Sequence, residues 1–175
     1  MKKYILILSF FVFTKIVIAQ DKINWLSFEK AIELNTKNPK PIIIDVYTDW
    51  CGWCKKLDKD TYSNKVIIDY INKYFHAIKL DGEGKKDITY KGYTFKFKQQ
   101  GRSKYHELPA ALMNGKLSYP TTIFMDENQK IIQNVPGYLP KERMEKILVF
   151  FSNNNYKTKK WEIFEKEFKS KFPSK

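Results

Sequence analysis

The chain has two cysteines, Cys51 and Cys54, and four residues separate Cys51 from the run 42–46, a run that is apolar except for Asp45. A β-branched apolar run predicts a buried strand, and a Cys-x-x-Cys pair at a strand-to-helix junction is typical of thiol–disulfide exchange sites. Both thiols would lie within one helical turn, so they could form a disulfide with each other. The first would lie at the helix N-terminus, where free N–H groups and the helix dipole favour a reactive thiolate.

Two other roles for the cysteine pair remain open. In an exported protein it could be a structural bridge, although so short a loop constrains the unfolded chain little. It could also belong to a metal site, but structural zinc needs four ligands, and His76 and His106 are not at ligand spacing. We therefore expect no metal and no cofactor.

The N-terminal segment resembles a secretory signal peptide. Lys2 and Lys3 precede the apolar residues 4–14, and the small residue Ala19 marks a cleavage site, which makes residues 1–19 the signal. Lys15 leaves the apolar stretch too short to span a bilayer. We expect export to the periplasm and no stable membrane anchor after cleavage, with an uncleaved N-terminal anchor as the alternative.

Positive charge dominates the composition, with a formal net charge of +13 over 175 residues. The lysines are spread along the chain, which favours a solvated surface over a nucleic-acid-binding face. The alternative is that the surface attracts an acidic partner or anionic lipid. We expect a monomer with no nucleic-acid partner.

Periodicity and turn signals predict an α/β fold. Helices are expected at residues 25–35, 51–60, 64–74, 106–113, 140–151 and 161–172, and strands at 42–47, 75–80, 121–125 and 130–135. Strands separated by helices predict a parallel pair, and the closing hairpin adds antiparallel strands, which gives a mixed central β-sheet flanked by helices on both faces.

Two segments extend this core, which we place in residues 21–152. An insertion at about residues 82–105 is expected to hold an exposed strand, because Tyr93, Phe95 and Phe97 alternate with polar residues, in a hairpin about Lys91-Gly92. Residues 153–175 form a C-terminal helical extension. The apolar stripe of Trp161, Phe164, Phe168 and Phe172 predicts a helix packed on the domain, with a partner-binding helix as the alternative.

Four features in order make residues 41–151 resemble the thioredoxin superfamily. They are the Trp50-Cys51-Gly52-Trp53-Cys54-Lys55 motif, Asp45 six residues before Cys51, Tyr119-Pro120 at the start of a strand, and Gly137 at the end of the closing hairpin. The chain is most similar to exported bacterial thioredoxin-like proteins of the Bacteroidetes type. This implies a thioredoxin-like fold with an insertion before the cis-proline and an extra C-terminal helix.

The resemblance implies catalytic roles for three residues. Cys51 would be the partly exposed nucleophile, with Lys55 and Lys56 adding positive potential, and Cys54 the resolving thiol. Asp45 would be the base, with a pKa raised by its apolar strand. The alternative for Asp45 is a strand-end acid with a local hydrogen bond.

Four residues are expected to bind substrate. A cis Pro120, implied by the resemblance, would expose the Tyr119 backbone to an extended substrate that adds strand-fashion. Trp50 and Trp53 would form an apolar surface beside the sulfurs, with a core position as the alternative for Trp50. His106 is expected at a helix start or on the surface.

We therefore expect an exported thiol–disulfide oxidoreductase acting on disulfide-containing proteins. Trp53 stands where thioredoxin has proline and oxidising members have histidine, which favours a reductase or isomerase kept reduced by a membrane electron donor. The alternatives are a disulfide oxidase of the same fold, a redox-silent module holding peptides in the groove by Pro120, and an assembly or surface-adhesion protein using the insertion and the tail.

Overall fold

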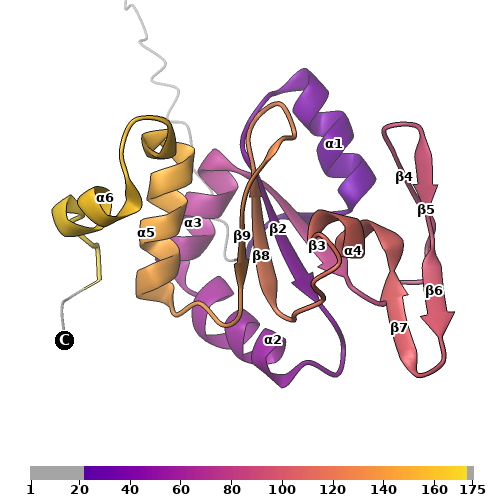
Figure 1. The fold of residues 1–175 in the computed structure, drawn as a ribbon. Coiled ribbons are helices and arrows are strands. Elements are labelled where there is room, and N and C mark those ends of the chain that lie inside the picture. Colours follow the sequence, from indigo (N-terminus) through magenta and orange to yellow (C-terminus); the bar gives the residue numbers. More distant parts are fainter. Residues whose placement is uncertain (1–21, 173–175) are drawn as a thin grey trace, which may run out of the picture.

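A computed structural model describes residues 22–172 of the chain (Figure 1). Its centre is a five-stranded sheet in the order β1-β3-β2-β8-β9, in which β3 pairs in parallel with β1 and β2, and β8 pairs antiparallel with β2 and β9. The strands are Trp25–Leu26 (β1), Ile42–Tyr47 (β2), His76–Asp81 (β3), Thr121–Met125 (β8) and Ile131–Pro136 (β9). The predicted mixed sheet is confirmed. The predicted signal peptide lies outside the described residues.

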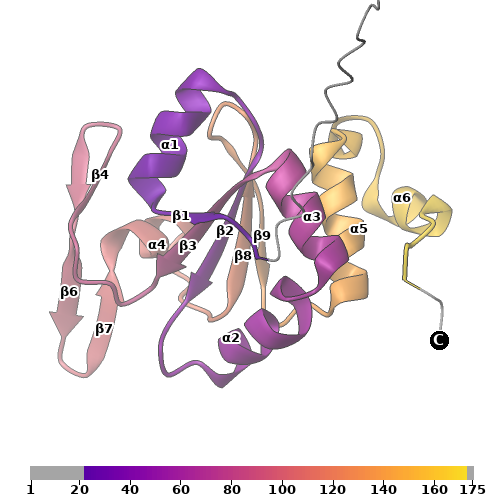
Figure 2. The same ribbon diagram turned by 180° about the vertical axis from the view of Figure 1, so that it is seen from behind.

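Helices cover both faces of the sheet (Figures 1 and 2). On one face lie Phe28–Lys37 (α1) and Glu107–Leu112 (α4), and on the other lie Gly52–Leu57 (α2), Lys65–Tyr74 (α3) and Lys141–Ser152 (α5). The central strand β2 feeds both cores, since Ile42 and Ile44 pack on the α1 side and Ile43 packs on the α3 side. This burial on both faces explains why residues 42–46 are apolar except for Asp45.

The predicted helix over residues 25–35 is wrong at its start. Trp25 and Leu26 form the short edge strand β1, and Ser27 then caps α1 by accepting a hydrogen bond from the Lys30 backbone N–H at 3.3 Å. A two-residue strand is too short to give a periodic pattern in the sequence. It is recognised only by its pairing with β3 in the folded protein.

The predicted helix over residues 51–60 changes its geometry halfway. The α-helix α2 ends at Leu57 and continues as a π-helical turn, η1 (Asp58–Tyr62), which the sequence did not indicate. The Thr61 hydroxyl in this turn donates a hydrogen bond to the Leu139 carbonyl at 2.6 Å. The wider π turn places Asp58 and Tyr62 beside β3, where both contact Lys79.

The insertion contains two hairpins rather than one. The first pairs β4 (Ile88–Tyr90) with β5 (Tyr93–Phe95), and the second pairs β6 (Phe97–Gln100) with β7 (Ser103–His106). Lys91 and Gly92 both have positive φ, at 50° and 79°, as a tight two-residue hairpin turn requires, so the predicted turn is confirmed. Phe97 was wrongly expected to extend the same strand. Figure 1 shows both hairpins beside α1 and α4.

The second hairpin leads directly into α4. His106 is the N-cap of this helix, because its Nδ1 accepts a hydrogen bond from the Leu108 backbone N–H at 3.1 Å, and Pro109 lies in the first turn. The predicted helix-start position of His106 is therefore confirmed.

The C-terminal extension packs on α5, as predicted. After a 3₁₀ turn (η2, Asn155–Lys157), α6 (Trp161–Glu167) ends earlier than expected, and Phe168 and Phe172 contact the core from beyond the helix. The buried carboxylate of Glu145 on α5 accepts hydrogen bonds from the Ser170 hydroxyl at 2.5 Å and the Lys171 backbone N–H at 2.9 Å. Within residues 22–172, none of the helices has the length and apolar character needed to cross a bilayer.

Candidate active site

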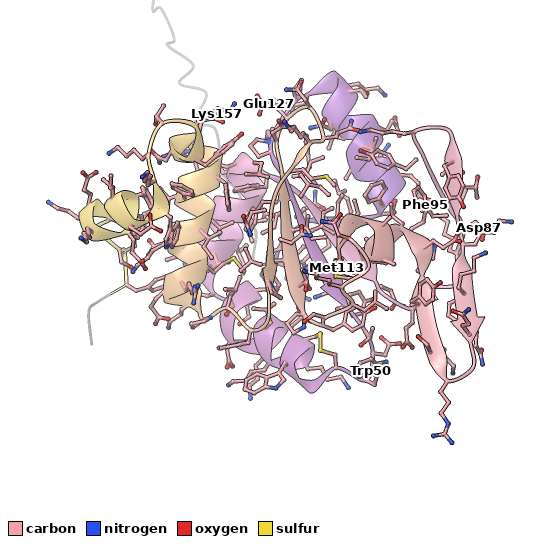
Figure 3. The ribbon with its side chains drawn as sticks, viewed as in Figure 1. Trp50, Asp87, Phe95, Met113, Glu127 and Lys157 are labelled. Carbon is pink, nitrogen blue, oxygen red and sulfur yellow. A yellow bond between two sulfur atoms is a disulfide. The ribbon has the colours of Figure 1, made fainter. Side chains whose placement is uncertain are left out.

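Cys51 and Cys54 form a disulfide at the start of α2. Cys51 is the N-cap of this helix, and its Sγ accepts a hydrogen bond from the Cys54 backbone N–H at 3.0 Å. Figure 3 shows this region, where Trp50 is labelled at the edge of the molecule beside α2. The predicted closure of the two sulfurs within one helical turn is confirmed.

Cys51 is more buried than predicted. Its exposed fraction is 4% and that of Cys54 is 2%, so the expected partial exposure of Cys51 is wrong for this oxidised state. The physical reason is the disulfide itself, because the Cys51 sulfur is bonded to a side chain that lies in the core. What distinguishes the two cysteines here is position, since Cys51 precedes the helix and Cys54 lies within it.

The two tryptophans beside the cysteines are exposed, at 65% for Trp50 and 60% for Trp53, so Trp50 is not a core residue. Trp50 donates a hydrogen bond from Nε1 to Glu83 Oε1 at 3.0 Å, and its ring meets Tyr119 edge-to-face with centroids 5.9 Å apart. Trp53 lies 5.7 Å from the ring of Tyr138. These contacts position two exposed indoles that are next to the cysteines in the chain.

The peptide bond between Tyr119 and Pro120 is cis, as the resemblance implied. The Pro120 carbonyl accepts a hydrogen bond from the Gly137 N–H at 2.8 Å, which ties this segment to the end of β9. A hollow of about 430 Å³ opens beside this cis-proline segment, and Ser118 and Thr121 are among the residues that line it. The predicted substrate-binding residues Trp50 and Tyr119 therefore meet at one surface, and Pro120 lies next to them.

Replacing Gly82 with alanine is expected to disturb this surface. A Cβ at Gly82 would lie 2.4 Å from Tyr119 Cε1 and 2.6 Å from its Cζ and hydroxyl, so the ring must move. Overpacking of this kind lowers the free energy of unfolding by about 1–3 kcal/mol. Displacing Tyr119 should also change the fluorescence of Trp50, which it contacts.

Denaturant unfolding and tryptophan fluorescence measure both effects. Gly52→Ala is the matched control, because apart from its chain neighbours and the nearby helix backbone nothing lies within 4 Å of a Cβ built there. An unchanged stability and emission spectrum in Gly82→Ala would contradict the expected displacement of Tyr119.

Asp45 is buried in the middle of the sheet, where it pairs with Lys79 of β3 on one side and Thr122 of β8 on the other. Side chains alternate along β2, so Asp45 shares the face of Ile43, which α2 and η1 cover. Burial raises the pKa of Asp45 to about 6, against the opposing effect of Lys79. The predicted raised pKa is confirmed, and the alternative of a strand-end acid is wrong.

Sequence reasoning missed Lys79, the ion-pair partner of Asp45. Its Nζ lies 2.6 Å from Asp45 Oδ2 and also bonds to the carboxylate of Asp58. A signal existed, because Asp45 is the one charged residue within the predicted strand 42–47 and Lys79 the one within the predicted strand 75–80, with opposite signs. Buried charges in proteins are paired, so the two interruptions together indicate a contact. Glu83, which orients Trp50, had no such signal.

The histidines make structural contacts with backbone carbonyls. His76 Nε2 lies 2.7 Å from the Asn38 carbonyl, and His106 Nε2 lies 3.1 Å from the Lys86 carbonyl. In the part of the chain that the structure describes, no group of three or more His, Cys, Asp or Glu side chains is arranged to hold a metal ion.

Two of the known proteins similar to this chain are named for thiol–disulfide chemistry. The chain is 26% identical over 135 residues to the thiol:disulfide interchange protein DsbD of Pectobacterium atrosepticum, covering 74% of this chain but only 20% of DsbD. It is 27% identical over 129 residues to the thiol-disulfide oxidoreductase ResA of Bacillus thuringiensis, covering 68% of both chains. A solved thioredoxin-fold protein from Helicobacter pylori has a TM-score of 0.56 and 24% identity, covering 74% of this chain and 80% of that one.

The similarity to the solved structure concerns the fold alone. The family match is broader, because residues 28–152, most of the chain, fit the model of the thioredoxin-like domain. The chain therefore belongs to the thioredoxin-like domain family.

Proposed function

We propose that this protein is an exported thiol–disulfide oxidoreductase that reduces or isomerises protein disulfides through a Cys51/Cys54 dithiol–disulfide cycle. The observation that carries the proposal is the disulfide at the start of α2, a helix on the sheet face that holds Asp45, with the exposed indoles of Trp50 and Trp53 next to the cysteines in the chain. The names of the relatives DsbD and ResA describe the same class of activity.

The reaction begins with the reduced protein. The Cys51 thiolate attacks one sulfur of a substrate disulfide, which forms a mixed disulfide and releases the first substrate thiolate. The Cys54 thiolate then attacks Cys51 Sγ, which releases the second substrate thiolate and closes the Cys51–Cys54 bond. The substrate gains two electrons, and a reductant must return two electrons to the protein before the next cycle.

Asp45 takes the proton that Cys54 loses in the second step. A buried thiol gives up its proton reluctantly, so a base on the same side of the sheet assists it. A pKa of about 6 leaves Asp45 mostly ionised at neutral pH and still able to hold a proton transiently. This balance suits a group that must both accept and release a proton.

Trp50, Trp53, Tyr119 and Pro120 form the docking surface for the substrate. Two exposed indoles supply apolar area, and Trp50 is fixed by Glu83 and Tyr119, so little side-chain freedom is lost on binding. The backbone at Tyr119 offers a place for an extended segment of the substrate beside the sulfurs.

The direction of electron flow and the cellular location are also proposals. No histidine stands between the cysteines to stabilise the thiolate strongly, which favours a reductase or isomerase over an oxidase. The signal-like residues 1–19 support export, where a membrane electron donor would keep the protein reduced.

Reduction of insulin disulfides by the protein without residues 1–19, with dithiothreitol as reductant, tests the activity. We expect catalysis above the dithiothreitol background, and none from the Cys51→Ser/Cys54→Ser variant. Equal rates for the two proteins would leave a redox-silent binding module instead. Equilibration with a glutathione series then gives the reduction potential, and a value as oxidising as about −120 mV would reverse the proposed direction.

A further inference from the structure

Lys79 contacts two carboxylates, and only one of them is the buried base. Its Nζ lies 2.6 Å from Asp45 Oδ2 and donates a hydrogen bond to Asp58 Oδ1. The exposed fraction of the side chain rises from 1% for Asp45 to 20% for Lys79 and 47% for Asp58. The three groups therefore lead from the core to the surface.

Aromatic rings surround the ammonium group on its other sides. Its distances to the ring centroids are 5.2 Å for Trp25, 5.1 Å for Tyr47 and 5.5 Å for Tyr62. These rings come from β1, β2 and η1, so Lys79 is enclosed by three different elements. The faces of the rings attract a cation but accept no strong hydrogen bond, which leaves the two carboxylates as its main charged partners.

We propose that Asp58 is a positioning residue for the active-site base: it holds the Lys79 ammonium between two carboxylates and thereby limits how strongly Lys79 stabilises the charged form of Asp45. Without Asp58, the Lys79 ammonium would pair with the Asp45 carboxylate alone. The catalytic consequence rests on the proposed function, whereas the electrostatic arrangement does not.

Lys79 and Asp58 are expected to affect the ionisation of Asp45 in opposite directions. Lys79 favours the carboxylate of Asp45, whereas Asp58 disfavours it, both by its own negative charge and by sharing the ammonium. The other titratable groups that face the pair are Tyr62 of η1 and Tyr47 of β2. Burial raises the pKa of both tyrosines, so they are neutral at the pH values concerned.

Carbon-detected NMR titration of the Asp45 carboxyl in the oxidised protein tests the proposal without any substrate. In Asp58→Asn we expect the Asp45 pKa to fall by about half a unit or more, because one charge is lost and the ammonium is no longer shared. In Lys79→Met we expect it to rise. Asp58 is nearly half exposed, so its variant should fold, and Lys79→Gln replaces the methionine variant if that one does not.

The double variant Asp58→Asn/Lys79→Met separates action through Lys79 from direct repulsion. If Asp58 acts by positioning Lys79, its substitution shifts the Asp45 pKa less in the Lys79→Met background than in the native one. Equal shifts in the two backgrounds, or no downward shift in Asp58→Asn alone, would overturn the proposal.

Asp60→Asn is the matched control. Asp60 lies on the same π-helical turn, but its carboxylate binds Lys56 at 2.5 Å and the Tyr138 hydroxyl at 3.3 Å rather than Lys79. Its removal should leave the titration of Asp45 unchanged. A shift as large as that of Asp58→Asn would mean that any charge on η1 acts alike, which contradicts a specific role for Asp58.

The pH profile of the second chemical step links the titration to catalysis. The rate at which Cys54 resolves the mixed disulfide should fall at acid pH as Asp45 becomes protonated, which gives the pH profile an acid limb. In Asp58→Asn this limb should move to lower pH, by the same amount as the pKa of Asp45 measured by NMR. If the NMR shifts appear and no variant is active, the proposed function fails and the role of Asp58 stands. If the protein is active and the NMR shifts are absent, the positioning role fails alone. If the NMR shifts appear and the acid limb does not move, Asp45 is not the base of this step.

Discussion

Replacing Cys54 with serine is expected to trap the protein on its substrate as a stable mixed disulfide. Cys51 precedes α2 and can attack a substrate disulfide, but a serine within the helix cannot displace the substrate from Cys51. Turnover should fall to the background rate of the reductant, while a covalent adduct accumulates. Non-reducing electrophoresis and mass spectrometry of Cys54→Ser mixed with a disulfide-containing protein measure both.

The matched variant is Cys51→Ser, which keeps the other thiol. We expect no adduct from it, because Cys54 is 2% exposed and lies within the first turn of the helix. Adducts from Cys51→Ser alone would reverse the assigned roles of the two cysteines. This comparison matters because both sulfurs are buried in the oxidised structure, so exposure alone does not identify the nucleophile.

Replacing Asp45 with asparagine is expected to stabilise the protein at neutral and alkaline pH. The carboxylate is buried and its pKa is raised to about 6, so its charged form is held at a cost in folding free energy. An amide of the same shape removes this charge, and Lys79 keeps Asp58 as a partner. At pH 8 the gain should be roughly 2–3 kcal/mol, from the difference between a folded pKa of about 6 and an unfolded pKa of about 3.9.

The sign of the pH dependence follows from the same two values. Between about pH 4 and pH 6 the folded state binds the proton of Asp45 more tightly than the unfolded state does. This contribution to stability is therefore fully present below about pH 4 and is lost as the pH rises through about 6. The difference in stability between Asp45→Asn and the native protein should grow over this interval and then stay constant.

Denaturant unfolding of both proteins between pH 4 and pH 8 measures this difference, and other carboxylates cancel in the comparison. Asp69→Asn is the control, because Asp69 is an exposed carboxylate on α3 paired with Lys65 and should change stability little. A lower stability of Asp45→Asn at pH 8 would contradict a destabilising buried charge. The same variant should also slow resolution of the mixed disulfide, which the stability data alone do not address.

Local signals predicted much of the fold correctly. The Lys91-Gly92 turn was predictable because two residues with positive φ are a property of the turn itself. Residues 42–46, apolar except for Asp45, predicted a buried strand, because a strand covered on both faces places both sets of alternating side chains in the core. Where neighbours far along the chain decide the outcome, prediction failed, as at Trp25, which joins a sheet edge instead of a helix.

In the candidate site too, local signals were predictive and contacts between distant residues were not. Cys51, Cys54 and Asp45 were found because a short motif and an unexpected charge stand out in the sequence, and cis Pro120 was inferred only through family resemblance. Glu83 and Asp58 escaped notice because an exposed acid in a charged segment carries no signal of what it contacts. The burial of Cys51 was also missed, since it depends on the disulfide and on the packing around it.

By itself, the sequence determined the strand, the turn into the helix and the two thiols one turn apart, since these depend on backbone preferences over a few neighbouring residues. Only the tertiary structure determined which distant side chains contact one another around this segment. The register of β2 against β3 brings Lys79 to Asp45, the π turn brings Asp58 to Lys79, and Gly82 makes room for the Tyr119 ring that supports Trp50. Such contacts join residues far apart in the chain, and their energies depend on packing and burial that no local pattern encodes.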